Sequence, residues 1–479
     1  MIFSSFNFIV FFVAVLGIYS LARNYPQRAV VILAASILFY ASWKPAYLIL
    51  LAASLTINYG IYSILFRRRS KAWLVAGVAI NIVVLVFYKY LGLLVETTFG
   101  LGRLLGVDTP DARPTWIDWA LPLGISFYTF HMLSVMIDVY RGEWTKHISF
   151  LSWTLYVTFF PHMIAGPILR ASELVEQLEQ LRGLNLNNLR TGMLIFIAGL
   201  AKKVLLADNL APIVEELYSQ PEQLDFWMAW FATIAFAMQI YFDFSGYSEM
   251  AIGLARMFGV TLPRNFKYPY ISRSVREFWQ RWHITLSRWL RDYLYISLGG
   301  SRRGEARNYA NLMATMLLGG LWHGAGWTFV FWGFLHGAYL IAHRLLLNFY
   351  ARMGWIGHTL SARLISWAGL PTTFILVCFT WVFFRATNFA DAWIIGGAML
   401  GLADPIGAPP QVRGYLKVLL GIAFIIAYAE PWFVRIVSKH GLLSWWRAPY
   451  PLRGLAYASL VLLLVIFGGG TQKFIYFDF

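Results

Sequence analysis

Long apolar stretches separated by short polar loops run through the whole chain. A bilayer core accommodates about 20 apolar residues of α-helix. Stretches of roughly this kind fall near residues 6–22, 29–42, 46–66, 72–95, 119–139, 149–168, 190–206, 225–243, 308–321, 326–347, 364–384, 414–430 and 455–469. Several are short or interrupted by glycine and proline, which a membrane tolerates only where the backbone is buried in protein or lines a cavity. The pattern predicts an all-α polytopic membrane protein of about ten to thirteen transmembrane and re-entrant helices, with residues 1–479 as one domain.

The composition also indicates a membrane protein. Of the 479 residues, 59% are hydrophobic, 18% aromatic and only 13% charged, against about 25% charged residues in soluble domains. This excludes a water-soluble fold. The net charge is +16, but no low-complexity basic tail is present, so the charge indicates basic loops between spans and not nucleic-acid binding. The single cysteine, Cys378, excludes an internal disulfide and a multi-cysteine metal site, and we expect no metal.

The early loops predict the orientation in the membrane. No basic region precedes the first apolar stretch and no small-residue cleavage site follows it, so we expect a retained span and not a signal peptide. Arg23 and Arg28 follow the first stretch, and four basic residues within 67–71 follow the third, whereas the loop 96–119 after the fourth has a higher acidic content. Basic loops remain in the cytoplasm. The N-terminus is therefore predicted to face outward.

The densest polar cluster is the segment 264–307, which this orientation places on the cytoplasmic side. Phe278, Trp282, Trp289 and Tyr293 recur there at helical spacing with charged residues between them, which predicts an amphipathic or partly embedded helix. One interpretation is a loop that touches anionic headgroups of the bilayer. The other is a basic binding site for a phosphate-bearing cofactor, because guanidinium groups match phosphate geometry. The candidate cofactor-binding residues are Arg281, Arg288, Arg291, Arg302 and Arg303.

Two histidines are candidate catalytic residues. His323 lies among glycines and apolar residues, and an ionisable group at membrane depth is costly enough to suggest a function. The alternative is a histidine that joins two helices by hydrogen bonds. His283 lies in the middle of the predicted amphipathic helix. Of the other histidines in or near the spans, we expect structural roles for His336 and His343 and assign none to His131 and His162.

The chemistry available to such histidines is proton transfer. A neutral imidazole can take the proton of a hydroxyl group while that group attacks a carbonyl. The sequence has no Gly-x-Ser-x-Gly nucleophile motif, no His-Glu-x-x-His zinc motif, no Walker loop and no dinucleotide fingerprint. Histidines without an evident protein nucleophile favour direct acyl transfer from an activated donor to a hydroxyl group.

Six stretches in order resemble the membrane-bound O-acyltransferase family, within it the bacterial branch that O-acetylates polysaccharides or D-alanylates teichoic acids. They are 122–130 (PLGISFYTF), 160–167 (FPHMIAGP), 241–248 (YFDFSGYS), 265–270 (NFKYPY), 278–287 (FWQRWHITLS) and 319–324 (GGLWHG). The resemblance covers nearly the whole chain. It implies a ring of tilted helices around a central tunnel that joins a cytoplasmic donor site to an outward-facing acceptor site. It aligns His323 with the family's catalytic histidine and His283 with a second polar position.

The C-terminal residues 473–479 (KFIYFDF) resemble a tyrosine motif of the same branch. There the tyrosine, here Tyr476, is a candidate acyl carrier, which would divide one transfer into two. The alternative is an aromatic residue at the bilayer interface. A relay also requires the C-terminus to lie outside, and the number of spans leaves this open.

The resemblance implies acetyl-CoA as the acyl donor, with its phosphates at the basic cluster and its acetyl group near His323. Asp243 and Ser245 are candidates for orienting the acyl carbonyl or stabilising the developing oxyanion. Aromatic side chains that would narrow the tunnel favour a short acyl group. These candidates are Trp279, Trp282, Trp322 and Trp327.

The predicted external loops are too short to bind a long polymer. The resemblance therefore implies a partner, a periplasmic or membrane-anchored acetyltransferase of the SGNH-hydrolase type, which would place the acetyl group on a polysaccharide such as alginate. Three alternatives remain: a lipid or protein O-acyltransferase, a transporter or flippase, and a non-catalytic membrane scaffold. Release of free CoA separates an enzyme from the last two.

Overall fold

The computed structural model describes residues 1–110, 114, 120–164, 166–353, 359–468, 472 and 474–475, and every regular element in these ranges is a helix. The chain divides into two compact units. Unit 1 is Met1–Gly192 with Leu254–Leu262, and unit 2 is Met193–Gly253 with Pro263–Asp478. Each unit is described by itself below.

Six helices in the described part of the chain are long and apolar enough to cross a membrane. They are Tyr47–Arg68, Lys71–Leu104, Trp327–Arg352, Trp367–Arg385, Gly414–Val437 and Tyr450–Phe467. Shorter apolar helices are Phe6–Leu21, Tyr25–Ala41 and Phe389–Met399. The all-α polytopic membrane class is confirmed. Fewer helices reach spanning length than the predicted ten to thirteen segments, because some of those segments form short helices or contain several charged residues.

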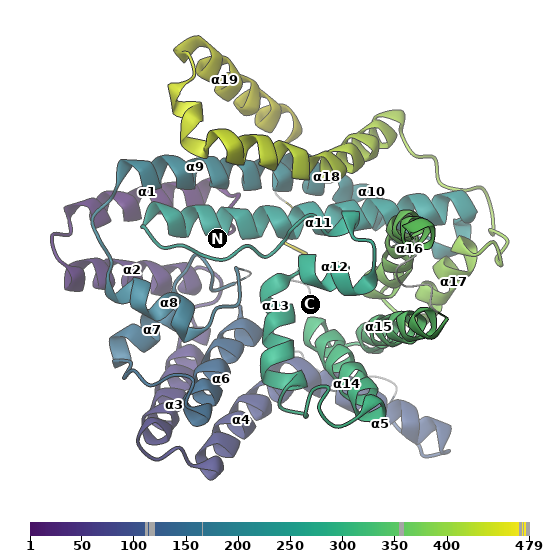
Figure 1. The fold of residues 1–479 in the computed structure, drawn as a ribbon, viewed down its shortest axis with the longest axis horizontal. Coiled ribbons are helices and arrows are strands. Elements are labelled where there is room, and N and C mark those ends of the chain that lie inside the picture. The colour runs from purple at the N-terminus through teal and green to yellow at the C-terminus, as the bar shows by residue number, and fades with distance from the viewer. Residues whose placement is uncertain are drawn as a thin grey trace. The chain divides into compact units, whose positions relative to one another are not determined.

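Unit 1 contains the N-terminal helices, coloured purple to blue in Figure 1. They are α1 (Phe6–Leu21), α2 (Tyr25–Ala41), α3 (Tyr47–Arg68), α4 (Lys71–Leu85), the π-helix η1 (Val86–Tyr90), α5 (Leu91–Leu104), α6 (Ile125–Arg141), α7 (Phe150–Thr158) and α8 (Ala171–Glu179). Phe8, Phe39 and Phe160 form an aromatic cluster with ring centroids 5.8–6.5 Å apart. α3 and α4 are joined by a buried amide pair, Asn58 and Asn81.

The two buried histidines of unit 1 make structural hydrogen bonds. His131 Nε2 accepts from the Leu169 N–H at 3.2 Å, and His162 Nε2 lies 3.0 Å from the Tyr156 carbonyl oxygen. Both side chains are fully buried, and their rings lie 4.7 Å apart. They connect α6 and α7 to the chain that follows α7.

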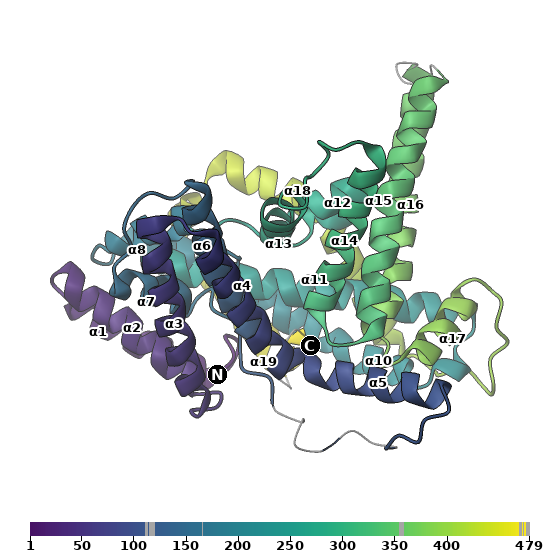
Figure 2. The same ribbon diagram turned by 90° about the horizontal axis from the view of Figure 1, so that it is seen from below.

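Unit 2 contains the remaining helices, and α9 (Leu186–Ala201) passes into it from unit 1. They are the π-helix η3 (Lys202–Ala207), α10 (Asp208–Tyr218), η4 (Pro221–Gln223), α11 (Phe226–Met257), η5 (Pro269–Ile271), α12 (Val275–Arg281), α13 (Ile284–Trp289), the π-helix η6 (Leu290–Tyr295), α14 (Glu305–His323), α15 (Trp327–Arg352), α16 (Thr359–Arg385), α17 (Phe389–Met399), α18 (Gly414–His440), η7 (Leu442–Arg447) and α19 (Tyr450–Phe467). Figure 2 shows α15 and α16 as a long antiparallel pair.

Glycines allow close helix contacts at two places in unit 2. Gly199 of α9 and Gly246 of α11 meet backbone to backbone, so that a β-carbon on Gly246 would lie 2.6 Å from the Gly199 carbonyl oxygen. Gly320 of α14 and Gly333 of α15 make the second contact, where a β-carbon on Gly320 would collide with the Phe329 carbonyl. Small residues permit this approach between membrane helices. The first contact positions the charged end of α9 beside α11, and the second positions the end of α14.

The segment 278–293 does not form one helix. α12 ends at Arg281 and α13 begins at Ile284, and His283 between them has φ of 41°, in the left-handed region. The prediction of a continuous amphipathic helix with His283 in its middle is therefore wrong. A left-handed conformation at a residue other than glycine persists only where the surroundings hold it, and these surroundings form the site described next.

Candidate active site

The loop 265–267 holds the break at His283. The Ile284 N–H donates to the Asn265 carbonyl and the Lys267 N–H donates to the Arg281 carbonyl, both at 2.9 Å. The two chain segments thus pair at both sides of His283. This pairing satisfies backbone groups that the helix break exposes.

Asn265 also fixes the protonation pattern of His283. The Asn265 Oδ1 accepts from the Thr285 N–H at 3.3 Å and from the Thr285 hydroxyl at 2.8 Å. A backbone N–H can only donate, so this atom is the amide oxygen, and His283 Nδ1, 3.2 Å from it, must carry a proton. The lone pair of the neutral ring is then on Nε2, which is buried and has no hydrogen-bond partner among the described residues. His283 therefore presents a nitrogen that can accept a proton.

His323 is the last residue of α14 and is 2% exposed. The chain leaves the helix at Gly324, where a β-carbon would collide with the ring of Phe329. The imidazole packs edge-on against Trp332 and Phe384, with ring centroids 5.0 and 5.3 Å away. The close packing at this helix end holds the histidine in an aromatic, largely water-free environment.

The structure brings His283 and His323 together. Their ring centroids are 6.5 Å apart. The Trp322 ring lies 6.0 Å from His283 and 5.0 Å from His323, and Phe244 packs edge-on against His283 at 4.7 Å. Two buried imidazoles at this separation can act on one small reacting group, and the aromatic walls exclude water from it.

Three of the four tryptophans assigned to an acyl tunnel have different surroundings. Trp322 lies beside both histidines, as described. Trp282 is fully buried and packs against Phe266 and Trp381, each at 5.0 Å. Trp327, the first residue of α15, is 52% exposed. Trp322 and Trp282 belong to the aromatic surroundings of the histidines, whereas Trp327 does not.

Asp243 belongs to a buried ion cluster that holds the C-terminal tail. Lys203 Nζ lies 2.6 Å from both Asp243 Oδ1 and Asp208 Oδ1. The Ile475 N–H donates to Asp243 Oδ2 at 2.7 Å, and Lys203 donates to the Gln472 carbonyl at 3.3 Å. Asp243 is thus a charged anchor for the tail. Tyr476, the candidate acyl carrier, lies outside the described residues.

The tail also packs close to His283. Phe474 is fully buried and stacks on Tyr247 at 4.5 Å, and its ring lies 5.6 Å from Phe244. Phe244 in turn contacts the His283 ring. The residues immediately before Tyr476 are therefore separated from a candidate catalytic histidine by one aromatic side chain.

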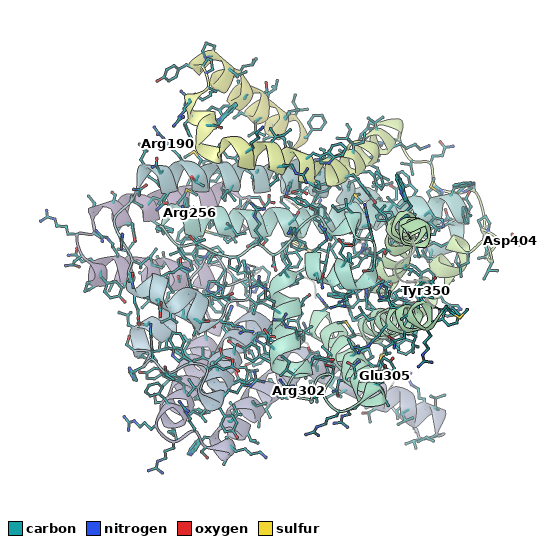
Figure 3. All side chains as sticks on the ribbon, viewed as in Figure 1. Arg190, Arg256, Arg302, Glu305, Tyr350 and Asp404 are labelled. Atoms are coloured by element: carbon teal, nitrogen blue, oxygen red, sulfur yellow. The ribbon has the colours of Figure 1, made fainter. Side chains whose placement is uncertain are left out.

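The five candidate cofactor-binding arginines are spread along the segment after loop 265–267. Arg281 pairs with Glu277 at 2.8 Å, and Arg291 pairs with Asp292 at 2.6 Å. Arg288, Arg302 and Arg303 are exposed, and Figure 3 shows Arg302 projecting outward from the turn before α14. Arg291 is exposed as well, so four of the five arginines lie on the surface of the unit.

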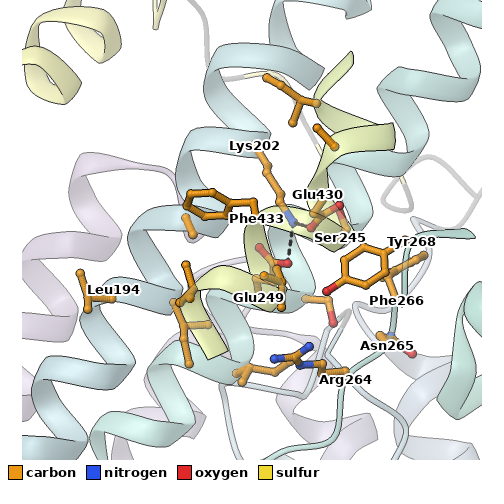
Figure 4. Close-up of a pocket in the computed structure, with 18 residues that line it drawn as sticks. Leu194, Lys202, Ser245, Glu249, Arg264, Asn265, Phe266, Tyr268, Glu430 and Phe433 are labelled. Carbon is orange, nitrogen blue, oxygen red and sulfur yellow. Dashed lines mark hydrogen bonds and ion pairs between the residues drawn. The ribbon is translucent and has the colours of Figure 1, made fainter. Parts of the chain in front are cut away.

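Ser245 lines a cavity of about 690 Å³ in unit 2, bounded by α9, α11, α18 and the loop 264–268 (Figure 4). Its walls are mostly apolar. At the polar end, Lys202 forms ion pairs with Glu249 and Glu430. Asn265, which orients His283, also lines this cavity.

His336 of α15 is one of the histidines for which we expect a structural role. His336 is fully buried, and its Nδ1 accepts from the Trp279 Nε1–H at 3.2 Å while its Nε2 lies 3.0 Å from the Thr380 hydroxyl. It connects α12, α15 and α16. The expected structural role of His336 is confirmed.

Sequence reasoning missed several residues of this region. Asn265 was part of a recognised motif, but its role depends on the backbone break at His283, 18 residues away. Lys202, Lys203 and Glu430 had a usable signal, because charged residues inside apolar stretches are costly at membrane depth. The structure gives each of the three a charged partner. Among the described residues, no group of three or more His, Cys, Asp or Glu side chains could hold a metal ion.

The chain is similar to known proteins over the region that contains His283 and His323. The model of the membrane-bound O-acyltransferase family matches residues 143–384, which include both. A probable alginate O-acetylase from Azotobacter vinelandii is 42% identical over 414 residues, covering 84% of this chain and 79% of that protein. The chain belongs to the membrane-bound O-acyltransferase family. It is therefore an O-acyltransferase.

Other relatives indicate the branch of this acyltransferase family. A peptidoglycan O-acetyltransferase from Helicobacter pylori is 37% identical over 398 residues, covering 77% of this chain and 73% of that protein. A teichoic acid D-alanyltransferase from Bacillus subtilis is 26% identical over 291 residues, covering 56% of this chain and 69% of that protein. The two O-acetyltransferases share more identity with this chain than the D-alanyltransferase does, which supports the polysaccharide O-acetyltransferase branch.

Proposed function

We propose that this O-acyltransferase moves an acetyl group from cytoplasmic acetyl-CoA across a bacterial inner membrane, for O-acetylation of an extracellular or periplasmic polysaccharide. The observation that carries the proposal is the pair of buried imidazoles, 6.5 Å apart, inside the matched family domain. The names of the relatives supply the acyl group and the polymer class, with alginate and peptidoglycan as the examples.

In this proposal His323 is the general base. It takes the proton of the acceptor hydroxyl while the hydroxyl oxygen attacks the thioester carbonyl. The C–S bond then breaks, and the acetyl group remains on the acceptor oxygen as an ester. The sulfur takes the proton that His323 had accepted, so CoA leaves as the thiol and the imidazole is neutral again. His283, oriented by Asn265, contacts the same reacting group from the other side. The CoA phosphates are bound by Arg281, Arg288, Arg291, Arg302 and Arg303.

The acceptor of the first transfer is the Tyr476 phenol. Two contacts support this role: the Ile475 N–H is tied to Asp243, and Phe474 is packed against Phe244 beside His283. The acetylated tyrosine then passes its acyl group to a periplasmic or membrane-anchored SGNH-type acetyltransferase, which places it on the polysaccharide. The relay requires the C-terminus and the N-terminus both to face outward.

The test is mass spectrometry of the purified protein after exposure to acetyl-CoA. Wild type is compared with His323→Ala and Tyr476→Phe, and both free CoA and acetylated peptides are followed. We expect His323→Ala to lower CoA release by about 10²–10⁴-fold and Tyr476→Phe to abolish the acetyl-tyrosine peptide. A folded His323→Ala protein that releases CoA at the wild-type rate would refute the role of the base, and CoA release without an acetyl-tyrosine would refute the relay alone.

A further inference from the structure

The cavity beside Asn265 has an apolar wall that continues onto a membrane-facing surface. Ile426, Phe433 and Val434 of α18 line it, and α18 contains the candidate span Gly414–Val437. Phe433 is 68% exposed, and neighbouring residues on the same helix that do not line the cavity, such as Ile425, are exposed to a similar extent. Exposed apolar surface on a spanning helix is covered by lipid chains, so the cavity is continuous with the surface that hydrocarbon covers.

The opposite end of the cavity is charged. Lys202 lies between Glu249 and Glu430, with Nζ–O distances of 2.6 and 2.5 Å, so the three side chains carry one excess negative charge. Glu249 is still 30% exposed. Arg264, which is exposed, lines the cavity near Glu249 (Figure 4). An accessible carboxylate and an accessible guanidinium thus stand at the same polar end.

Three buried polar groups line the cavity without partners. Ser245 Oγ, Ser248 Oγ and Asn265 Nδ2 make no hydrogen bond to any described residue, and the three residues are only 1%, 2% and 1% exposed. Buried polar groups in proteins are nearly always hydrogen-bonded. These hydroxyl and amide groups can donate to phosphate or ester oxygens, so their placement indicates a polar ligand between the serines and Asn265.

We propose that this cavity binds one phospholipid that has an amine and a phosphate in its headgroup. The amine lies at Glu249 and Glu430, the phosphate lies at Arg264, and the ester region is hydrogen-bonded by Ser245, Ser248 and Asn265. The first part of one acyl chain lies against α9 and α18. A zwitterionic headgroup would match the carboxylate and the guanidinium at the polar end of the cavity. An acyl chain would match its apolar wall.

The test is native mass spectrometry of the whole purified protein with added phosphatidylethanolamine or phosphatidylglycerol of the same acyl chains. Ala198→Phe fills the apolar part of the cavity, and Glu249→Gln removes the amine partner. We expect each to lower phosphatidylethanolamine retention about tenfold, and the wild type to retain phosphatidylglycerol about tenfold less well. The matched controls Ala458→Phe and Glu216→Gln lie on exposed positions outside the cavity and should retain lipid as the wild type does.

Three outcomes would overturn the proposal. The first is unchanged retention in both cavity variants, and the second is equal retention of the two lipids by the wild type. The third is displacement of the lipid by acetyl-CoA, which would assign the cavity to the acyl donor. The readout is lipid retention, so a failure of the proposed acetyl transfer would leave this result unaffected, and thermal unfolding of each variant shows whether it is folded.

Discussion

At the residue scale, the site depends on how a single amide is placed. Asn265 Oδ1 accepts from Thr285 and from His283 Nδ1, and these contacts leave Nε2 of His283 as the proton acceptor. The orientation of His283 is therefore the property that a substitution at Asn265 should change.

Asn265→Ala is expected to lower acetyl-CoA turnover by about 10²-fold, the lower part of the range for positioned general acids and bases. The physical reason is loss of the acceptor that orients the His283 ring and fixes its tautomer. Asn265→Asp keeps an oxygen acceptor at the same place and is expected to retain more activity than the alanine variant. The measurement is CoA release with both kcat and KM. A change in KM alone would show that Asn265 serves donor binding and not the orientation of His283.

At the scale of elements, the glycine contacts decide where the functional helix ends lie. Gly320→Ala is expected to destabilise unit 2 because the new methyl group would meet the Phe329 carbonyl between α14 and α15. Overpacking of this kind costs about 1–3 kcal/mol. The matched control is Gly421→Ala in α18, where a β-carbon meets nothing within 4 Å and helix propensity favours alanine by about 1 kcal/mol. Thermal unfolding in detergent should give midpoints that move in opposite directions, and equal midpoints would contradict the close contact.

The same elements show what the sequence can predict. The apolar stretches predict most helices, because each one is a local property of the chain. The break at His283 was missed, since residues 278–293 keep helical spacing and contain neither glycine nor proline. The left-handed backbone of His283 depends on pairing with the loop 265–267. The position of the C-terminal tail depends on its hydrogen bonds to Asp243 and Lys203. Such long-range contacts leave no periodic signal in the sequence.

At the scale of the whole molecule, the orientation in the membrane can be tested with cysteines. The single native cysteine, Cys378, is fully buried, so it should react little with a membrane-impermeant maleimide. The positive-inside pattern predicts that Asp108→Cys is labelled on intact cells or spheroplasts and that Lys71→Cys is labelled only after permeabilisation. Both positions are exposed. The reverse labelling pattern would invert the predicted orientation and place the Tyr476 relay on the wrong side.

The relay through Tyr476 further requires the C-terminal tail to be docked beside the histidines when the acetyl group is transferred. Phe474 is fully buried two residues before Tyr476, and its stacking on Tyr247 anchors the tail beside Phe244 and His283. Removing a buried phenylalanine side chain costs about 3–5 kcal/mol. Phe474→Ala should therefore shift the tail toward undocked states and lower acetylation of Tyr476 at least about tenfold.

Single-turnover labelling with acetyl-CoA, followed by peptide mass spectrometry, measures this effect. Phe467→Ala is the matched control, because Phe467 ends α19 and is 50% exposed, so its loss should leave acetylation unchanged. Phe474→Tyr keeps the aromatic ring and should restore much of the labelling, which a general loss of folding would not allow. Acetylation of Tyr476 at the wild-type rate in Phe474→Ala would mean that the tail reaches the histidines without the packing of Phe474. The ion cluster at Asp243 alone would then determine the position of the tail.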